Sequence, residues 1–134
     1  MINIEPQLYT QIADRVLASY PNTWVTNVYT ATPPMFPCVY CTMEDNSVFR
    51  RTRSSTVVEN HGALSYRVEV FSNRVNEAKY EAEDIMAAVD EVLESLNFTR
   101  TSCSPAPNLY DASVYRLVAH YRAIVGKDHT IYRR

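Results

Sequence analysis

One stretch near the middle of the chain constrains the fold more than any other. Apolar and polar side chains alternate over residues 64–71. This alternation is typical of a strand with one buried face, because successive side chains point to opposite faces. Over residues 78–96 the apolar residues recur every three or four positions, which predicts an amphipathic helix about 30 Å long. Asn73 or Asn76 is expected to cap the start of this helix, and Asn97 to end it.

The same periodicities predict a second helix and four further strands. The first helix is expected to begin near Pro6, whose missing N–H does no harm in a first turn, and to end at Tyr20. We expect its apolar stripe to consist of Leu8, Ile12, Val16 and Leu17. The further strands are expected at residues 23–30, 38–44, 98–103 and 113–125.

These elements predict one α+β domain over residues 1–126, with a mainly antiparallel sheet of four to five strands and both helices on one face. A chain of 134 residues has the usual size of a single domain with its own core. Residues 45–60, between the second and third strands, are expected to form a long arm or loop. Residues 127–134 are expected to form a polar C-terminal tail that is either disordered or ordered by a neighbour.

The composition excludes several classes of protein. With 46% hydrophobic and 21% charged residues, it is typical of a soluble globular chain. There is no apolar run of the length that crosses a membrane and no signal-peptide pattern, so we expect a cytosol-like compartment. A net charge of −2 argues against general binding of nucleic acid. Gly62 and Gly126 stand alone, whereas a phosphate-binding loop needs clustered glycines.

Cys38 and Cys41 form a CxxC pair, and Cys103 makes the cysteine count odd. A redox CxxC normally opens a helix, where the helix dipole lowers the thiol pKa. This pair instead falls in a predicted strand, where positions three apart face opposite sides, a poor geometry for one zinc ion. We therefore interpret the cysteines as ordinary semi-buried residues, with a zinc or redox site as the alternative.

No run of residues has the spacing of a known catalytic motif. His61, His120 and His129 lie far apart, and none has a carboxylate at a spacing that suggests catalysis. The helix over residues 78–96 is rich in acidic side chains, but these are expected to be exposed, without neighbours that hold two pKa values apart. We expect no catalytic residue, no metal and no cofactor, and hence no enzyme. Ten tyrosines favour a protein that works by contact with other proteins.

The last predicted strand has two clear phases. Tyr121 and the residues that alternate with it are expected to face the core. Arg116, His120 and Arg122 occupy the other phase, so His120 is expected to be a surface or interface histidine. Trp24, on the first predicted strand, is expected in the core.

The order of elements and three local runs resemble the tail terminator family of long-tailed bacteriophages, also called tail completion or minor capsid proteins. The first run is a helix that leads into Tyr20-Pro21, followed by a strand that opens at 36–40. The second is the strand 66–73 before an acidic helix that ends at 96–98. The third consists of Asn108, Asp111 and the strand 115–125. Together these runs cover nearly the whole chain.

This resemblance implies a structural role in the virion. Members of the family form a hexameric ring that caps the head-proximal end of the tail tube, halts its growth and presents a surface to the head connector. The implied partners are further copies of the chain, the tail tube protein and the head connector or head-closure protein. DNA would pass through the ring without sequence-specific contact. The implied location is the virion neck, after assembly in the host cytoplasm.

The family fold, an α/β sandwich with an arm that reaches a neighbour, also implies where subunits meet. Mapped onto this chain, the arm corresponds to residues 45–60, and the C-terminal tail would be a second contact. The residues expected at the subunit interface are Arg50, Arg51, Arg53, Glu81, Asp84, Ile131, Tyr132 and Arg133. From the residues alone, the arginine run is either a solvated loop tip or a contact with a negatively charged surface, a neighbouring subunit or DNA.

Two other classes of function fit the sequence. A head-closure or other connector protein of the same neck shares the size and ring symmetry of a terminator. Outside the virion, the chain could be a small α+β adaptor, ligand-binding domain or enzyme. A binding domain or enzyme needs a pocket with convergent polar groups, and the sequence does not identify such groups.

Overall fold

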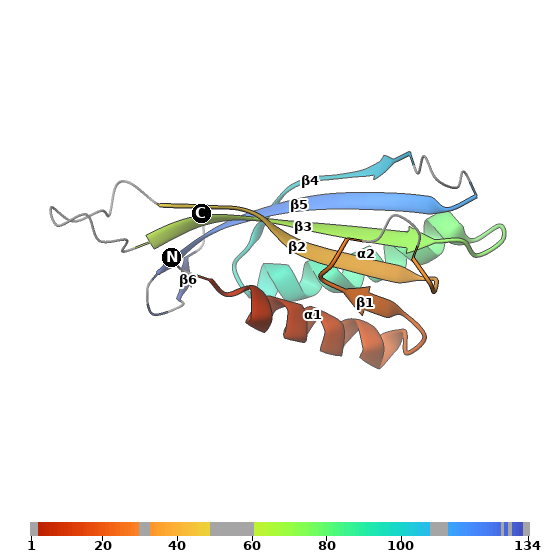
Figure 1. Ribbon diagram of the computed structural model, residues 1–134, viewed down its shortest axis with the longest axis horizontal. Helices are drawn as coiled ribbons and strands as arrows, with labels where there is room; N and C mark the ends of the chain where they lie inside the picture. The colour runs from red at the N-terminus through yellow and green to blue at the C-terminus, as the bar shows by residue number, and fades with distance from the viewer. Residues whose placement is uncertain are drawn as a thin grey trace, which may run out of the picture.

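The computed structural model describes residues 3–29, 33–48, 61–107, 113–126, 128 and 130–132 (Figure 1). It contains two helices and six strands, so the expected α+β class is confirmed. Neither helix is long and apolar enough to span a membrane. In chain order the elements are α1 (Glu5–Ser19), β1 (Trp24–Thr26), β2 (Cys38–Val48), β3 (His61–Ser72), α2 (Ala78–Ser95), β4 (Thr99–Ala106), β5 (Tyr115–Gly126) and β6 (Ile131–Tyr132).

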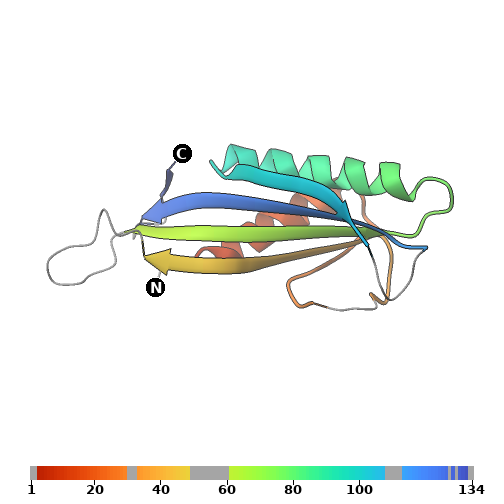
Figure 2. The same ribbon diagram turned by 90° about the horizontal axis from the view of Figure 1, so that it is seen from above.

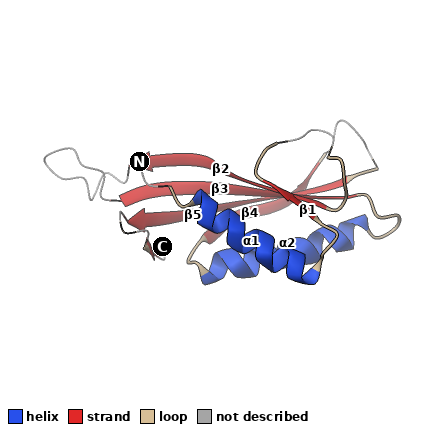
Figure 3. Cartoon of the chain, turned by 60° about the horizontal axis from the view of Figure 1, so that its bottom comes forward, coloured by secondary structure: helices blue, strands red, loops and turns tan. Residues whose placement is uncertain are grey.

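The sheet has the strand order β1-β2-β3-β5-β4, and β6 pairs with β5 beyond the end of β4. Every neighbouring pair is antiparallel except β1 and β2, which are parallel. Figure 2 shows the four long strands side by side. Figures 1 and 3 show α1 and α2 on the same face of the sheet, as the sequence predicted.

The main core lies between the helices and this face of the sheet. Leu8, Ile12 and Val16 of α1 are buried there. Leu17, expected in the same stripe, is 41% exposed. It follows Val16 directly and is therefore turned by about 100° around the helix, off the buried face. The opposed strands contribute the predicted core phases, including Tyr66 and Tyr121, both buried.

A second, smaller apolar cluster lies on the other face of the sheet. Its buried members are Cys38, Tyr40, Phe71 and Val114, with Trp24 and Phe36 packed against them. Trp24 is thus partly buried on the face opposite to the main core. The sheet therefore has apolar contacts on both faces near the start of β2 and the end of β3.

The predicted C-terminal end of α2 is confirmed, but its predicted N-cap is not. Its N-cap is Glu77, without a side-chain capping hydrogen bond, so the expected cap by Asn73 or Asn76 was wrong. Asn76 instead has φ = 64°, a left-handed conformation that asparagine tolerates and that turns the chain into the helix. Asn97 has φ = 68° and ends the helix as expected.

The strands β2 and β3 form a longer hairpin than the sequence predicted. β2 continues through a bulge between Met43 and Asp45 and pairs with β3 as far as Val48. The first residues assigned to the arm are therefore in a strand, because pairing with β3 outweighs their low β-propensity. The rest of that predicted arm, residues 49–60, lies outside the described residues.

The expected polar tail contains a short strand. Ile131 pairs with Val125, and Tyr132 pairs with Ile124. The Nδ2 of Asn97 also donates a hydrogen bond to the Ile131 carbonyl at 3.0 Å. This part of the tail is therefore ordered by the chain's own sheet. The sequence had predicted a tail that is either disordered or ordered by a neighbouring molecule.

Candidate interaction surface

The helix layer of the molecule carries most of its negative charge. Within α1 and α2 there are eight acidic and two basic residues, a net charge of −6. The rest of the chain carries seven acidic and eleven basic residues, a net charge of +4. The surface that the helices present is therefore acidic, and a surface of the opposite sign would be attracted to it.

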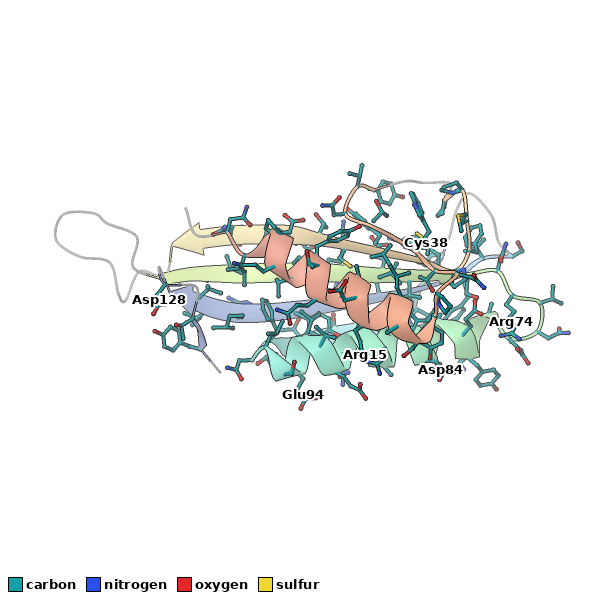
Figure 4. All side chains as sticks on the ribbon, turned by 90° about the horizontal axis from the view of Figure 1, so that it is seen from below. Arg15, Cys38, Arg74, Asp84, Glu94 and Asp128 are labelled. Atoms are coloured by element: carbon teal, nitrogen blue, oxygen red, sulfur yellow. The ribbon has the colours of Figure 1, made fainter. Side chains whose placement is uncertain are left out.

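Several carboxylates of α2 face solvent. Glu83, Asp84 and Glu94 are exposed, and none of them forms an ion pair with another described residue. Glu91, also exposed, pairs with Arg15 of α1 at 3.2 Å. Figure 4 shows Asp84 and Glu94 spaced along α2. Glu83, Asp84 and Glu94, three of the six acidic residues of α2, thus leave negative charge available to a partner.

Glu81 belongs to the first turn of α2, and its carboxylate lies next to the last residue of β3. The hydroxyl of Ser72, the last residue of β3, donates a hydrogen bond to Glu81 Oε1 at 2.7 Å. Arg74 Nη1 lies 3.6 Å from Glu81 Oε2, and Arg74 Nε lies 3.0 Å from Glu77 Oε2. The junction of β3 and α2 therefore holds two carboxylates and one guanidinium, which leaves it acidic.

A cleft of about 430 Å³ opens beside Glu81. Three segments that are distant in sequence form its walls: the C-terminal turn of α1, the Phe36-Pro37 turn and the connection from β3 to α2. Its lining includes Tyr20, Asn22, Thr23, Phe36, Arg74 and Glu81. Thr23 is 6% exposed, and its hydroxyl has no hydrogen-bond partner within the described part of the chain.

Of the other expected interface residues, the structure describes Ile131 and Tyr132, which form β6 at the opposite end of the molecule. Ile131 is partly buried against the core, whereas Tyr132 is 44% exposed. Arg50, Arg51, Arg53 and Arg133 lie outside the described residues. Figure 4 shows Arg74 at one end of the molecule and Asp128, which follows β5, at the other.

Chain geometry decides how these two ends can meet. The twelve residues of β3 separate its ends by about 36 Å, at roughly 3.3 Å per residue. β2 ends at Val48 and β3 begins at His61, and a chain of twelve residues joining two neighbouring strands can reach at most about 20 Å from them. The arginines among these twelve residues cannot reach Glu81 of their own chain. A contact of Arg50, Arg51 or Arg53 with Glu81 would therefore have to form between two molecules.

The face of the sheet away from the helices holds a network of paired charges. Glu69 of β3 is fully buried. Arg116 Nε donates to its Oε1 at 2.6 Å, and Arg116 Nη2 contacts the same oxygen. Arg67 Nε lies 3.4 Å from Oε2, within ion-pair range but without hydrogen-bond geometry. The two guanidiniums offset the cost of burying this carboxylate.

Glu44, at the bulge of β2, extends the network across the sheet. Its Oε2 lies 2.9 Å from Nδ1 of His120, and its Oε1 lies 3.5 Å from Nη1 of Arg67. A bulge redirects side chains, and here it places a β2 carboxylate against residues of both β3 and β5. His120, expected at the surface or an interface, is thus a partner in this network, which ties three strands together.

The cysteines have the arrangement that the strand prediction implied. Cys41 belongs to the main core and Cys38 to the cluster on the other face of β2. Burial raises the pKa of the Cys38 thiol to about 12 and also raises the pKa of Cys41. Both thiols therefore stay protonated near neutral pH, the form that binds metals and attacks disulfides poorly. Across the described part of the chain, no three His, Cys, Asp or Glu side chains gather into a possible metal site.

Sequence reasoning missed both the buried Glu69 and the cleft. The alternation of β3 placed Glu69 on the face away from the core, and the same pattern placed Arg116 on that face of β5. Strand order and register, which periodicity does not give, bring the two side chains together. The cleft needs the packing of three separate segments, and no local signal marks it.

Neither a protein-family model nor a curated protein matches this chain.

Proposed function

We propose that the protein is a structural component of a bacteriophage neck. In this role it forms a ring on the head-proximal end of the tail tube and joins the tube to the head connector. The resemblance noted in the sequence supports this role. The role requires contact surfaces and no catalytic group or cofactor.

The observation that carries the proposal is the placement of opposite charges at opposite ends of the β2–β3 hairpin. Glu81 lies beside Ser72, the last residue of β3, and Asp84 follows it in α2. Arg50, Arg51 and Arg53 come after β2 in the sequence, and β2 ends at Val48, at the other end of the hairpin. Because one chain cannot bring them together, their contact joins the head of one copy to the tail of the next. Such a heterologous contact gives a ring when the rotation closes.

A ring of this kind needs two further surfaces, one for the tail tube and one for the connector. The exposed large apolar residues are candidates for such contacts. Val75 and Tyr80 lie near the start of α2, and Val28 and Met35 lie between β1 and β2. These residues are 81%, 64%, 68% and 50% exposed, respectively, and their burial by a partner would be favourable.

Purified tail tubes test the proposal. Tubes are incubated with the protein, imaged by negative stain, and then offered fresh tube subunits. We expect density at one end of each tube and no further growth from that end. Tubes that stay bare and keep growing at both ends would contradict a terminator role. Binding to purified connectors, but not to tubes, would assign the head-closure role instead.

A further inference from the structure

We infer that the cleft between the C-terminal turn of α1, the Phe36-Pro37 turn and the β3–α2 connection is a binding site for a neutral sugar. Its volume of about 430 Å³ lies within the range of about 300–1,000 Å³ that is typical of small-ligand sites. All of its lining residues belong to the described part of the chain. The inference is independent of the proposed neck role, because it concerns a small ligand and no contact between subunits.

Two aromatic side chains line the cleft, and each is held by a different apolar cluster. Tyr20 packs against the main core, and Phe36 packs against the smaller cluster on the other face of the sheet. Both are only partly buried, so part of each side chain remains accessible to a ligand. Because packing already fixes them, little conformational entropy is lost when a ligand contacts them. A pyranose ring has apolar C–H faces, and their burial against aromatic carbons is favourable.

The polar lining of the cleft supplies both donors and acceptors. Asn22 and Asn73 are exposed, and neither side chain has a hydrogen-bond partner within the described ranges. Each amide offers two N–H donors and one carbonyl acceptor. The ion pairs of Arg74 use Nε and Nη1, which leaves the N–H groups of Nη2 as further donors. A hydroxyl is both a donor and an acceptor, so the neighbouring hydroxyls of a sugar match this mixed lining.

Glu81 is the acceptor whose position the fold fixes most closely. The Ser72 hydroxyl donates to its Oε1 at 2.7 Å, and Arg74 Nη1 lies 3.6 Å from its Oε2. Its side chain is 17% exposed. Each carboxylate oxygen has two lone pairs, so these contacts leave one acceptor site on each oxygen for the hydroxyls of a sugar. Glu81 therefore anchors the ligand, and the two asparagine amides complete its hydrogen bonds.

The charge of the cleft favours a ligand without net charge. Among the lining residues, only Arg74 and Glu81 are charged, and they pair with each other. A charged ligand would lose hydration on entry and gain little net attraction from this pair. Glu77, which contacts Arg74 from outside the lining, is 56% exposed, so water and salt screen its charge. A neutral sugar is therefore favoured over its anionic or cationic analogues.

Saturation-transfer difference NMR tests the site on the full-length protein, whether it is a monomer or a ring. The probes are D-glucose, D-galactose and D-mannose, each compared with its uronic acid and its 2-amino sugar as anionic and cationic analogues. We expect saturable binding of at least one neutral sugar, with Kd in the millimolar range, and weaker binding of its charged analogues. No saturable binding of a neutral sugar, or tighter binding of a charged analogue of the same sugar, would overturn the inference.

Substitutions in the protein show whether the sugar binds in this cleft. Asn22→Ala, Asn73→Ala and Glu81→Ala should each weaken binding by about tenfold. Asn27→Ala is the matched control, because Asn27 is also exposed but lies outside the lining, and it should leave the affinity unchanged. The three asparagine variants should keep the melting temperature of the parent protein.

Equal affinity in the parent and in all the cleft variants would overturn the assignment of the cleft. Ring formation on tail tubes is measured separately and is expected in every asparagine variant. Loss of sugar binding in Asn22→Ala with rings intact would support the site, whereas absence of rings in the parent protein would count against the proposed function alone.

Discussion

Arg116 Nε lies 2.6 Å from Oε1 of the fully buried Glu69, on the face of the sheet away from both helices. The pair joins β5 to β3 across 47 positions of sequence. Burial of a carboxylate without a cation costs free energy of folding. The Glu69–Arg116 pair therefore stabilises the register of β3 and β5 in which the two side chains meet.

Replacement of Arg116 by methionine should destabilise the fold strongly. The change keeps most of the side-chain volume but leaves Glu69 with Arg67 as its one remaining cation among the described residues. We expect a loss of about 3 kcal/mol in the free energy of unfolding, measured by urea denaturation. Arg122→Met, an exposed position on the same phase of β5, is the control and should change stability by less than about 0.5 kcal/mol. Similar losses in both variants would contradict the role given to the pair.

Two buried tyrosines should respond oppositely to loss of the hydroxyl. Tyr121 donates a hydrogen bond to Asp90 Oδ1 at 2.9 Å, whereas the Tyr66 hydroxyl has no partner within the described ranges. Tyr121→Phe should therefore cost about 1–2 kcal/mol, and Tyr66→Phe should be neutral or stabilising. Thermal melts of the two variants beside the parent protein check this. A larger loss for Tyr66→Phe than for Tyr121→Phe would disprove it.

The three thiols should separate into one reactive and two protected groups. Cys103 is exposed, whereas Cys38 and Cys41 are at most 1% exposed. We expect one equivalent of thiol to react with a disulfide reagent in the native protein and three in denaturant. Partial desolvation raises the pKa of Cys103, so its rate should increase with pH through the alkaline range. Cys103→Ser should abolish the native reaction, and rapid reaction of a second thiol would contradict the burial of β2.

Stability should fall as the pH rises above about 9. Burial raises the pKa of Cys38 to about 12 and raises that of Cys41 in the same direction. Above pH 9 the unfolded chain loses these protons while the folded chain keeps them, so the folded state binds more protons and is disfavoured as pH increases. For the two thiols together we expect a loss of about 2–3 kcal/mol between pH 8 and pH 10.

Urea denaturation at several pH values measures this dependence. The double variant Cys38→Ala, Cys41→Ala should lose stability less steeply over the same pH range, whatever its stability at pH 7. Burial also raises the pKa values of Tyr66 and Tyr121, so the decline should continue above pH 10 in both proteins. An identical slope in parent and variant below pH 10 would contradict the contribution of the thiols.

The sequence alone was sufficient for the elements whose periodicity is strong. Alternation in β3 and β5 predicted which side chains face the core, and the three- and four-residue spacing predicted α2. It was insufficient where pairing overrides local preference, as in the continuation of β2 to Val48 and the strand β6. It could not predict that Arg116 meets Glu69 or that Thr23 and Glu81 line one cleft, because these contacts depend on strand order and helix packing.

The most direct test of the central claim is the mass of the protein in solution. Light scattering is recorded over a concentration series at low and high salt, with negative-stain images of the same fractions and of fractions mixed with tail tubes. We expect closed rings with the mass of about six chains, formed by head-to-tail contact and weakened by salt. A monomer at every concentration that also forms no ring on tail tubes would contradict the account.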